Sequence, residues 1–208
     1  KRSGTTTLYQ WGRNNAFPGS TVAQGQIISS KEDIHMNNKI QKPSYFFSTK
    51  MDRYKRIDKT DGLIKYHYFY NLWSMNNRNA VAEGKVSTVD VVKTIYDPCP
   101  VGFNVPANGA FSGFTMSTTD TSATFDSNSG HNFWTNSSHT ESIYFPASGF
   151  RAAENAILNA VSTSGNYWAA DPNDVTDGCS MGFAKNSVTP LYHNTRTYGF
   201  AVRPVAEK

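Results

Sequence analysis

The chain is short of several features that define common classes of protein. Its 208 residues include only two cysteines and 17% charged residues, and no apolar run approaches the ~20 residues of a membrane span. A scaffold held by several disulfides is therefore excluded, and no membrane-spanning segment is expected. The net charge of +4 is modest and lacks the dense basic patch of a nucleic-acid-binding protein, so nucleic acid is not an expected partner.

Catalytic signatures are also missing. The sequence contains no His-Glu-x-x-His motif, no Gly-x-Ser-x-Gly elbow and no Walker loop. The five histidines do not have the spacing of metal ligands, and nothing singles out a pair of carboxylates for acid–base work. We therefore expect no catalytic activity and no cofactor.

The residues that are abundant indicate an extracellular, loop-rich, β-containing domain. Aromatic residues make up 13% of the chain, and Gly, Pro, Asn, Ser and Thr are frequent. The length allows a substantial core, and the simplest division is a single domain over residues 1–208. We expect a mature secreted fragment or the last domain of a longer secreted protein.

Local patterns predict mainly short strands. Thr5–Arg13 reads as a strand, and Phe133-Trp134 is expected to pair with Ile143–Phe145. Two segments fit either a short helix or irregular strands, namely Val86–Ile95 with apolar residues at every third position, and Arg151–Val161. Further short strands are expected over 22–28, 54–57 and 63–70.

The stretch Tyr96–Pro106 reads YDPCPVGFNVP, and its three prolines and one glycine predict a rigid corner. Phe103 and Val105 are expected to alternate inward from this corner. The corner also holds Cys99, 80 residues before Cys179. Spacing alone leaves open whether these two thiols form one disulfide that closes a long loop or remain free.

Five motifs together resemble a known family: YQWGR with NNAFPG, then YDPCPVGFNVP, FPASGFR, NYWAADP and YGFAVRPV. The chain resembles the Fibrobacter succinogenes major paralogous domain, which is common in surface proteins and lipoproteins of Bacteroidetes. The resemblance covers the whole chain and is firmest over 8–19, 96–106 and 143–205.

The resemblance implies an α+β fold of C-type-lectin type, which is shared with the formylglycine-generating sulfatase-modifying enzymes. In that fold the N- and C-terminal strands pair, here Leu8–Trp11 with Phe200–Val205, and the chain between them builds a loop-rich half. The residues expected to be buried are Trp11, Phe103, Trp168 and Phe200.

Two departures from the family bear on its chemistry. Many members end in Val-Arg-Cys where this chain has Val202-Arg203-Pro204, so a family disulfide from the corner to that terminal cysteine would leave Cys99 without its partner. A formylglycine-generating enzyme needs reactive thiols close together, and two cysteines this far apart in sequence argue against that activity.

The candidate site is the segment 166–198, a polar and varied stretch between two apolar anchors, Tyr167-Trp168 and Phe200–Val202. Constant anchors around a varied middle are typical of a scaffold that holds a binding surface. The predicted ligand-binding residues are Asn166, Tyr167, Asp171, Asn173, Asp174, Asp177, Ser180, Tyr192, His193, Asn194 and Tyr198.

Some proteins of this fold class are varied by diversity-generating retroelements, which randomise adenines in a C-terminal repeat. Asn codons can then become Tyr, His, Asp, Ser, Thr, Ala, Cys, Gly, Leu, Val or Arg, but not Lys, Glu, Gln, Met or Trp. The residues of this set found here are Asp171, Asp174, Val175, Cys179, Ser180, Leu191, Tyr192, His193, Asn194 and Tyr198. Ordinary drift of a loop explains the same residues, so both interpretations stand.

If the segment is diversified, we expect Asp174, Tyr192, His193 and Tyr198 to share one solvent-facing patch. The partner would be a protein or glycan on another cell, and the domain would be displayed on a surface lipoprotein, a pilus tip or a phage particle. Two alternatives are a carbohydrate-binding or adhesin module without diversification, and an enzyme of the sulfatase-modifying-factor-like fold.

Calcium is the one metal that the sequence allows. Asp171, Asp174 and Asp177 fall at every third residue, and closely spaced carboxylates suit a hard cation. Asp171-Pro172-Asn173 also resembles loosely the proline-containing loop of sugar-binding C-type lectins. The alternative is a solvated turn with no ion.

Overall fold

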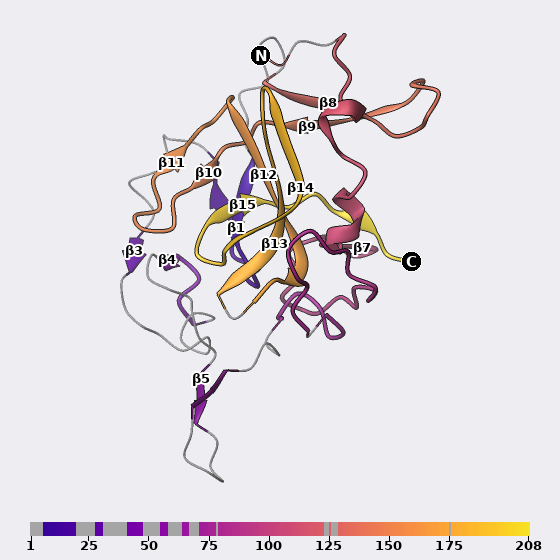
Figure 1. Cartoon of the computed structure of the whole chain (residues 1–208). Helices are drawn as coiled ribbons and strands as arrows, with labels where there is room; N and C mark the ends of the chain where they lie inside the picture. The colour runs from indigo at the N-terminus through magenta and orange to yellow at the C-terminus, as the bar shows by residue number, and fades with distance from the viewer. Residues whose placement is uncertain are drawn as a thin grey trace.

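A computed structural model describes residues 6–19, 28–30, 41–47, 55–57, 64–66, 71–77, 79–122, 125, 129–174 and 176–208, with only the backbone for 28–30, 55–57 and 64–66. All statements below concern these residues (Figure 1). Most of the strand expected over 22–28 lies outside them.

One mixed eight-stranded sheet organises this part of the chain. Its strands lie in the order β11-β10-β15-β12-β13-β14, and β1 joins β15 to β2. The bounds are β1 Thr7–Gln10, β2 Phe17–Pro18, β10 Phe150–Arg151, β11 Leu158–Asn159, β12 Ser164–Pro172, β13 Asp177–Ala184, β14 Ser187–Thr195 and β15 Gly199–Ala201.

The long antiparallel strands β12, β13 and β14 form the centre of the molecule in Figure 1, and β14 ends the strand order. The pairing of β13 with β14 shifts register between Ser180 and Gly182, opposite the part of β14 that contains Pro190. Proline has no N–H to donate, so it is tolerated in a strand at an edge or a bulge. β14 meets both conditions, because it lies at the edge of the sheet and its pairing with β13 shifts register at this point.

The predicted pairing of the terminal strands is confirmed. β1 runs antiparallel to β15, with Leu8 opposite Ala201 and Tyr9 opposite Phe200. The expected strand over 200–205 is divided, however. Its last part belongs to β16, Val205–Ala206, which pairs with β7, Phe103–Asn104.

Smaller pairs of strands lie around the main sheet. The predicted hairpin is present as β8, Gly130–Trp134, paired with β9, Ser142–Pro146. The remaining elements are β3 Ile28–Ser30 parallel to β4 Tyr45–Phe47, β5 Lys55–Ile57 antiparallel to β6 Ile64–Tyr66, and the 3-10 helices η2 Asn108–Phe111 and η3 Met116–Thr118. The β5–β6 pair lies within the two strands expected over 54–57 and 63–70.

The fold is rich in β-structure and loops, and the helical part of the α+β prediction is not found, because the described residues define no α-helix. The regularly spaced Val86, Val89, Val92 and Ile95 are exposed, so their spacing marks no buried helix face. Between β10 and β11, Ala156 has a φ of 61°, a left-handed conformation that interrupts a helix.

Two aromatic clusters form most of the core. One is rich in phenylalanine and includes Phe111, Phe133, Phe145, Tyr167 and Phe183. The other contains Trp11, Trp73, Trp168 and Phe200. Three of the four residues predicted to be buried are therefore buried.

The prediction for Phe103 is wrong, because 42% of its surface is exposed. Strand alternation was expected to place Phe103 and Val105 on the same inner face. β7 ends at Asn104, so the alternation does not continue to Val105, which is buried while Phe103 is not.

The opening motif supplies buried polar groups that tie distant segments together. Gln10 Nε2 donates to the carbonyls of Phe47 at 2.8 Å and Thr197 at 2.7 Å. Its Oε1 accepts from Arg13 Nη1 at 2.8 Å and from the Phe47 amide at 3.2 Å. All the hydrogen-bonding capacity of this buried amide is therefore used, as burial of a polar group requires.

Two further motifs act in the same way. Arg151 is buried, and its guanidinium donates to the carbonyls of Pro18 at 3.0 Å and Ala156 at 2.7 Å. In the proline corner, Asp97 accepts from the amides of Cys99 at 2.7 Å and Val105 at 2.9 Å. The residues that carry the sequence signature thus form a buried framework.

Candidate functional site

The edge strand β14 differs from every other long strand because none of its nine residues is buried. Most residues of its neighbour β13 are buried. Backbone pairing with β13 holds β14 in place, so its side chains contribute little to the core. We define the edge surface as Asn166, Asp177, Tyr192, His193, Asn194 and Tyr198.

One face of the sheet carries Tyr192 and Asn194. Tyr192 is opposite Ser180, which is opposite Trp168, so these three side chains share a face. Asn194 donates from Nδ2 to Ser180 Oγ at 3.1 Å. Tyr192 is 43% exposed and presents its ring to solvent.

Tyr198 adjoins this face from the loop between β14 and β15. Its ring stacks on Phe200 with centroids 5.4 Å apart and meets the edge of Phe150 at 5.7 Å. Burial raises the pKa of the Tyr198 hydroxyl, and Glu154 and Tyr192 add to this effect.

The other face carries His193, which is opposite Cys179 and so lies on the same side as Asp177. His193 Nδ1 is 2.8 Å from Asp177 Oδ2, and Nε2 is 3.8 Å from Glu83 Oε2. The imidazole also lies 5.4 Å, between ring centroids, from Tyr192. His193 thus joins the two faces around the edge of the sheet.

Asp174 shapes the turn that connects β12 to β13. Its Oδ1 accepts from the Thr176 amide at 2.6 Å, the Thr176 hydroxyl at 2.9 Å and the Asp177 amide at 2.7 Å. Partial burial raises the pKa of the Asp174 carboxyl, but these hydrogen bonds and Arg196 outweigh it, so the pKa is lowered. The carboxylate is therefore engaged in holding the turn.

Three predicted site residues, Tyr167, Asp171 and Ser180, are buried and do not belong to the exposed surface. Asp171 accepts from the Asn108 amide at 2.6 Å and from Asn77 Nδ2, which ties two loops to β12. Their strands have side chains packed against both faces, so alternation along them does not bring every second residue to solvent.

All three predicted asparagines are half-buried, and two of them, Asn166 and Asn173, lie outside β14. Asn173 donates from Nδ2 to the carbonyl of Val81 at 2.8 Å and so tethers the loop that carries Glu83. Asn166 donates to Ser164 Oγ at 3.0 Å along its own strand. Asn173 therefore acts mainly in loop attachment, whereas Asn166 remains beside the exposed face.

The three aspartates proposed for calcium have separate tasks. Asp171 binds two loops, Asp174 holds its own turn and Asp177 contacts His193. In the described part of the chain, no three His, Cys, Asp or Glu side chains are grouped so that they could hold a metal ion.

Both cysteines are free and buried. Burial raises the pKa of the Cys99 thiol, and the neighbouring Asp97 raises it further. Burial and Asp171 raise the pKa of Cys179 to about 12, against a lowering effect of Arg196. Neither thiol has the lowered pKa of a reactive cysteine.

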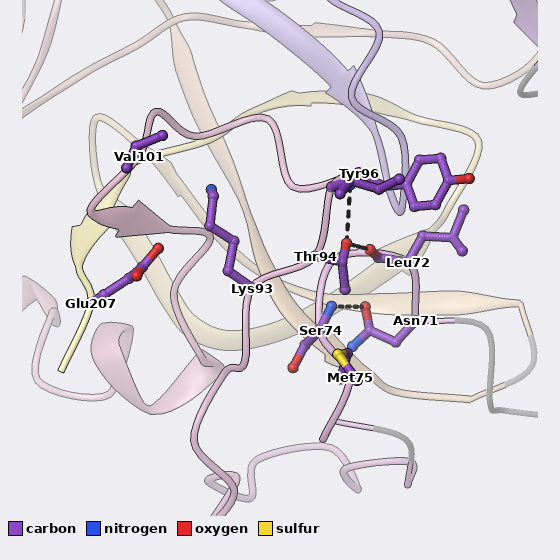
Figure 2. Close-up of a pocket in the computed structure, with 10 residues that line it drawn as sticks. Asn71, Leu72, Ser74, Met75, Lys93, Thr94, Tyr96, Val101 and Glu207 are labelled. Carbon is purple, nitrogen blue, oxygen red and sulfur yellow. Dashed lines mark hydrogen bonds between the residues drawn. The ribbon is translucent and has the colours of Figure 1, made fainter.

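A second surface was not found from the sequence. An open hollow of about 810 Å³ has Leu72, Met75, Ile95 and Val101 among its lining residues. Figure 2 labels three of these, Leu72, Met75 and Val101. Ile95 is 85% exposed and Val101 is 96% exposed. The only trace of this surface in the sequence was the regular spacing of valine and isoleucine over 86–95, and that spacing suggested a helix instead.

Two polar side chains beside this hollow, Lys93 and Thr94, are engaged within the protein. Lys93 Nζ donates to Asp97 Oδ1 at 2.9 Å and to the carbonyls of Cys99 at 2.8 Å and Phe103 at 2.7 Å. Thr94 donates to the carbonyl of Leu72, as drawn in Figure 2. The hollow therefore offers mainly apolar surface.

Two exposed acids beside the edge surface, Glu83 and Glu154, were also missed. Each lies in a loop outside 166–198, and only the fold brings it beside His193 or Tyr198. No sequence pattern distinguishes them from other solvated acids.

Residues 111–205 match a protein family described as a domain of unknown function, DUF8237. The matched region contains the whole edge surface and the strands β8 to β15. No curated protein and no solved structure matches the chain. Among the described residues, no helix has the length and apolarity needed to cross a membrane.

Proposed function

We propose that this protein is a non-catalytic, extracellular ligand-binding domain that binds a protein or glycan on another cell through its edge surface. The observation that carries this proposal is β14, a nine-residue strand with no buried side chain that backbone pairing holds in place. Apart from Val188, which packs against the phenylalanine-rich cluster, its side chains contribute little to the core, so the strand suits a surface that recognises a partner.

Asp174 holds its own turn and Tyr192 and His193 lie on opposite faces of β14, so the expected single patch of Asp174, Tyr192, His193 and Tyr198 is not formed. The division between framework and surface still favours diversification by a retroelement at the edge strand itself. Gln10, Arg13 and Arg151 form a buried framework, whereas Tyr192, His193 and Asn194 project from the edge. Tyrosine gives large contact area at low entropic cost, and asparagine gives adaptable hydrogen bonds, as in antibody loops. Cys179 does not count toward this set, because it is buried in the phenylalanine-rich cluster.

The pairing of the terminal strands and the many loops support the finer assignment to a C-type-lectin-like fold. In such a fold, binding residues are carried on loops and strands above a sheet that the two ends of the chain close. The edge surface occupies a position of this kind, between β14 and the loop that precedes β15.

The proposal is tested with a yeast-displayed library that randomises Tyr192, His193, Asn194 and Tyr198. We expect most members to remain folded, measured by resistance to protease, and binders to be selected against surface extracts of host and bacterial cells. A matched library at the buried positions Trp168, Ser180 and Met181 should mostly unfold. Equal loss of folding in both libraries would contradict the proposal.

Diversification has its own test, which is independent of binding. The gene should lie beside a reverse transcriptase and an adenine-rich template repeat. If neither is found, diversification is rejected, and the edge surface remains a candidate for a fixed partner.

A carbohydrate-binding or adhesin module is the second candidate, and one observation favours it. Tyr192 is exposed and Tyr198 is half-buried, and the faces of exposed aromatic rings can stack on sugars. A glycan array distinguishes the candidates, because binding to a defined sugar that Tyr192→Ser abolishes would favour the module. The enzyme alternative gains no support from two buried thiols with raised pKa values.

A further inference from the structure

A second cavity lies between the segment 79–89 and the buried end of β12. Its volume is about 290 Å³, and apart from Asn77 and Asp171 its lining residues all come from that segment. No residue of the edge surface lines it, so the cavity is a separate place on the molecule.

Hydrogen bonds hold this segment over the cavity. The Val81 amide donates to the carbonyl of Pro172 at 2.8 Å. The Ser87 amide donates to Asn108 Oδ1 at 2.8 Å, and Asn108 Nδ2 donates to the carbonyl of Lys85 at 2.8 Å. The segment is therefore attached to the rest of the fold on both sides of the cavity.

The carboxylate of Asp171 forms part of the cavity wall. Asp171 is only 1% exposed, and its Oδ1 accepts a hydrogen bond from Nδ2 of Asn77, which also lines the cavity. Its Oδ2 accepts from the Asn108 amide at 2.6 Å. Both donors are neutral, and a carboxylate has room for about four hydrogen bonds, so acceptor capacity and the negative charge remain.

The other fully buried carboxylate, that of Asp97, is treated differently. It forms an ion pair with Lys93, whose Nζ lies 2.9 Å from Oδ1. In the described part of the chain, no Lys, Arg or His forms an ion pair with Asp171, and the one cation of the lining, Lys85, is exposed. A buried charge is costly unless it is paired, so the cavity wall lacks a positive partner.

The rest of the lining limits what that partner can be. Several side chains of the wall are aliphatic, namely Ala80, Val81, Ala82, Val86 and Val89. A metal ion would need further charged ligands, and no three His, Cys, Asp or Glu side chains of the described residues are grouped to supply them. An ammonium group on an aliphatic chain matches both the carboxylate and the apolar walls.

We propose that this cavity binds a primary ammonium group on a short aliphatic chain. The ammonium donates to the carboxylate of Asp171, and the chain packs against Val81, Val86 and Val89. This is a binding site beyond the edge surface, and it does not depend on the function proposed for that surface. A free alkylamine and a lysine side chain share this chemistry.

The probes are n-butylamine and Nα-acetyl-lysine methylamide, with n-butanol and butyrate as matched neutral and acidic ligands. Binding is measured by saturation-transfer NMR titration of the natural chain. We expect the amines to bind and the alcohol and the acid not to bind. Binding of n-butylamine alone identifies a free amine as the ligand, whereas binding of both probes identifies a site that also takes a lysine side chain.

Two variants test the site itself. Asp171→Asn should weaken amine binding roughly ten- to hundredfold, as expected when a hydrogen bond to a charged group is lost. Asp171 also ties two loops to β12, so a second variant leaves it in place. Ala80→Phe puts a ring into the cavity from an exposed position and should weaken binding at least about tenfold.

The matched control is Ala206→Phe, which adds the same ring at an exposed alanine outside the lining. It should leave amine affinity unchanged, and Ala80→Phe should keep the unfolding temperature of the natural chain. The inference is overturned if neither amine binds, if n-butanol binds as tightly as n-butylamine, or if Ala80→Phe and Ala206→Phe have equal effects. None of these results bears on the edge surface, whose residues are unchanged in all three variants.

Discussion

The guanidinium of Arg196 lies over the indole of Trp11, 4.2 Å from the ring centroid. It also donates from Nη2 to the carbonyl of Asp174 at 2.6 Å and from Nε to that of Asp177 at 3.3 Å. This contact joins the opening motif to the turn before β13. That turn also positions β13, the strand that pairs with β14.

Substitution of Arg196 should destabilise the fold strongly. Arg196→Leu removes the hydrogen bonds to two carbonyls and the contact with Trp11, so we expect the free energy of unfolding to fall by about 3 kcal/mol. The neighbouring exposed Thr195→Ala should change it by less than about 0.5 kcal/mol. Urea titration followed by tryptophan fluorescence measures both, and similar values would argue against a structural role for Arg196.

Two glycines of β13 offer a matched comparison. A Cβ at Gly178 would lie 2.4 Å from Cδ1 of Trp11, whereas the nearest atom to a Cβ at Gly182 is Asn166 Oδ1 at 3.6 Å. Gly178→Ala should cost about 1–3 kcal/mol through overpacking, because the hydrogen bond from Trp11 Nε1 to Ala169 fixes the indole.

Gly182→Ala should be neutral or slightly stabilising, because alanine restricts the unfolded chain and meets no obstacle. Thermal unfolding of the two variants ranks them directly. The packing of Trp11 against β13 would be wrong if Gly178→Ala were tolerated as well as Gly182→Ala.

The thiols of Cys99 and Cys179 should not react with a thiol reagent in the folded protein. Burial raises the pKa of Cys99 and Cys179, so neither forms a thiolate at mildly alkaline pH, and neither is exposed to a reagent. We expect almost no reaction with a thiol reagent in the native state and reaction of two thiols after denaturation. A disulfide would instead leave the denatured chain unreactive until a reductant is added.

Stability should fall in acid through Asp174. Its pKa is lower in the folded protein than the ordinary value of about 4, so ionisation stabilises the fold above that pH. This contribution is lost as the pH falls through the lowered pKa. The stability difference between the natural chain and Asp174→Asn, measured by urea titration, should therefore be largest at neutral pH and shrink as the pH falls below about 4. A difference that grows in acid would contradict the hydrogen bonding of the turn.

The sequence predicted elements whose partners lie close by or whose motifs are specific. The β8–β9 hairpin follows from two aromatic runs and the turn between them. The β1–β15 pairing was inferred from the family resemblance, because no local pattern joins strands so distant in the chain. The register shift at Pro190 was not predicted, because it depends on how β13 and β14 pair.

The candidate site was predicted as a segment but not residue by residue. Alternation cannot reveal that Tyr167 and Ser180 are buried, because the strands β12 and β13 are covered by neighbours from other parts of the chain. The sequence suggested that Asp171 binds a ligand. In the structure its buried carboxylate accepts hydrogen bonds from two loops, through Asn77 and Asn108. Glu83 and Glu154 reach the edge surface only through tertiary structure, so no local pattern could have found them.

Pro190 and the register shift beside it protect β14 from pairing with other molecules, although the strand lies exposed at the edge of the sheet. An unprotected outer strand invites the same strand of another molecule to continue the sheet, and such growth leads to fibrils. A residue without an N–H and a local break in the ladder interrupt that growth. Substitutions elsewhere along β14 would therefore leave this protection against edge-to-edge pairing in place.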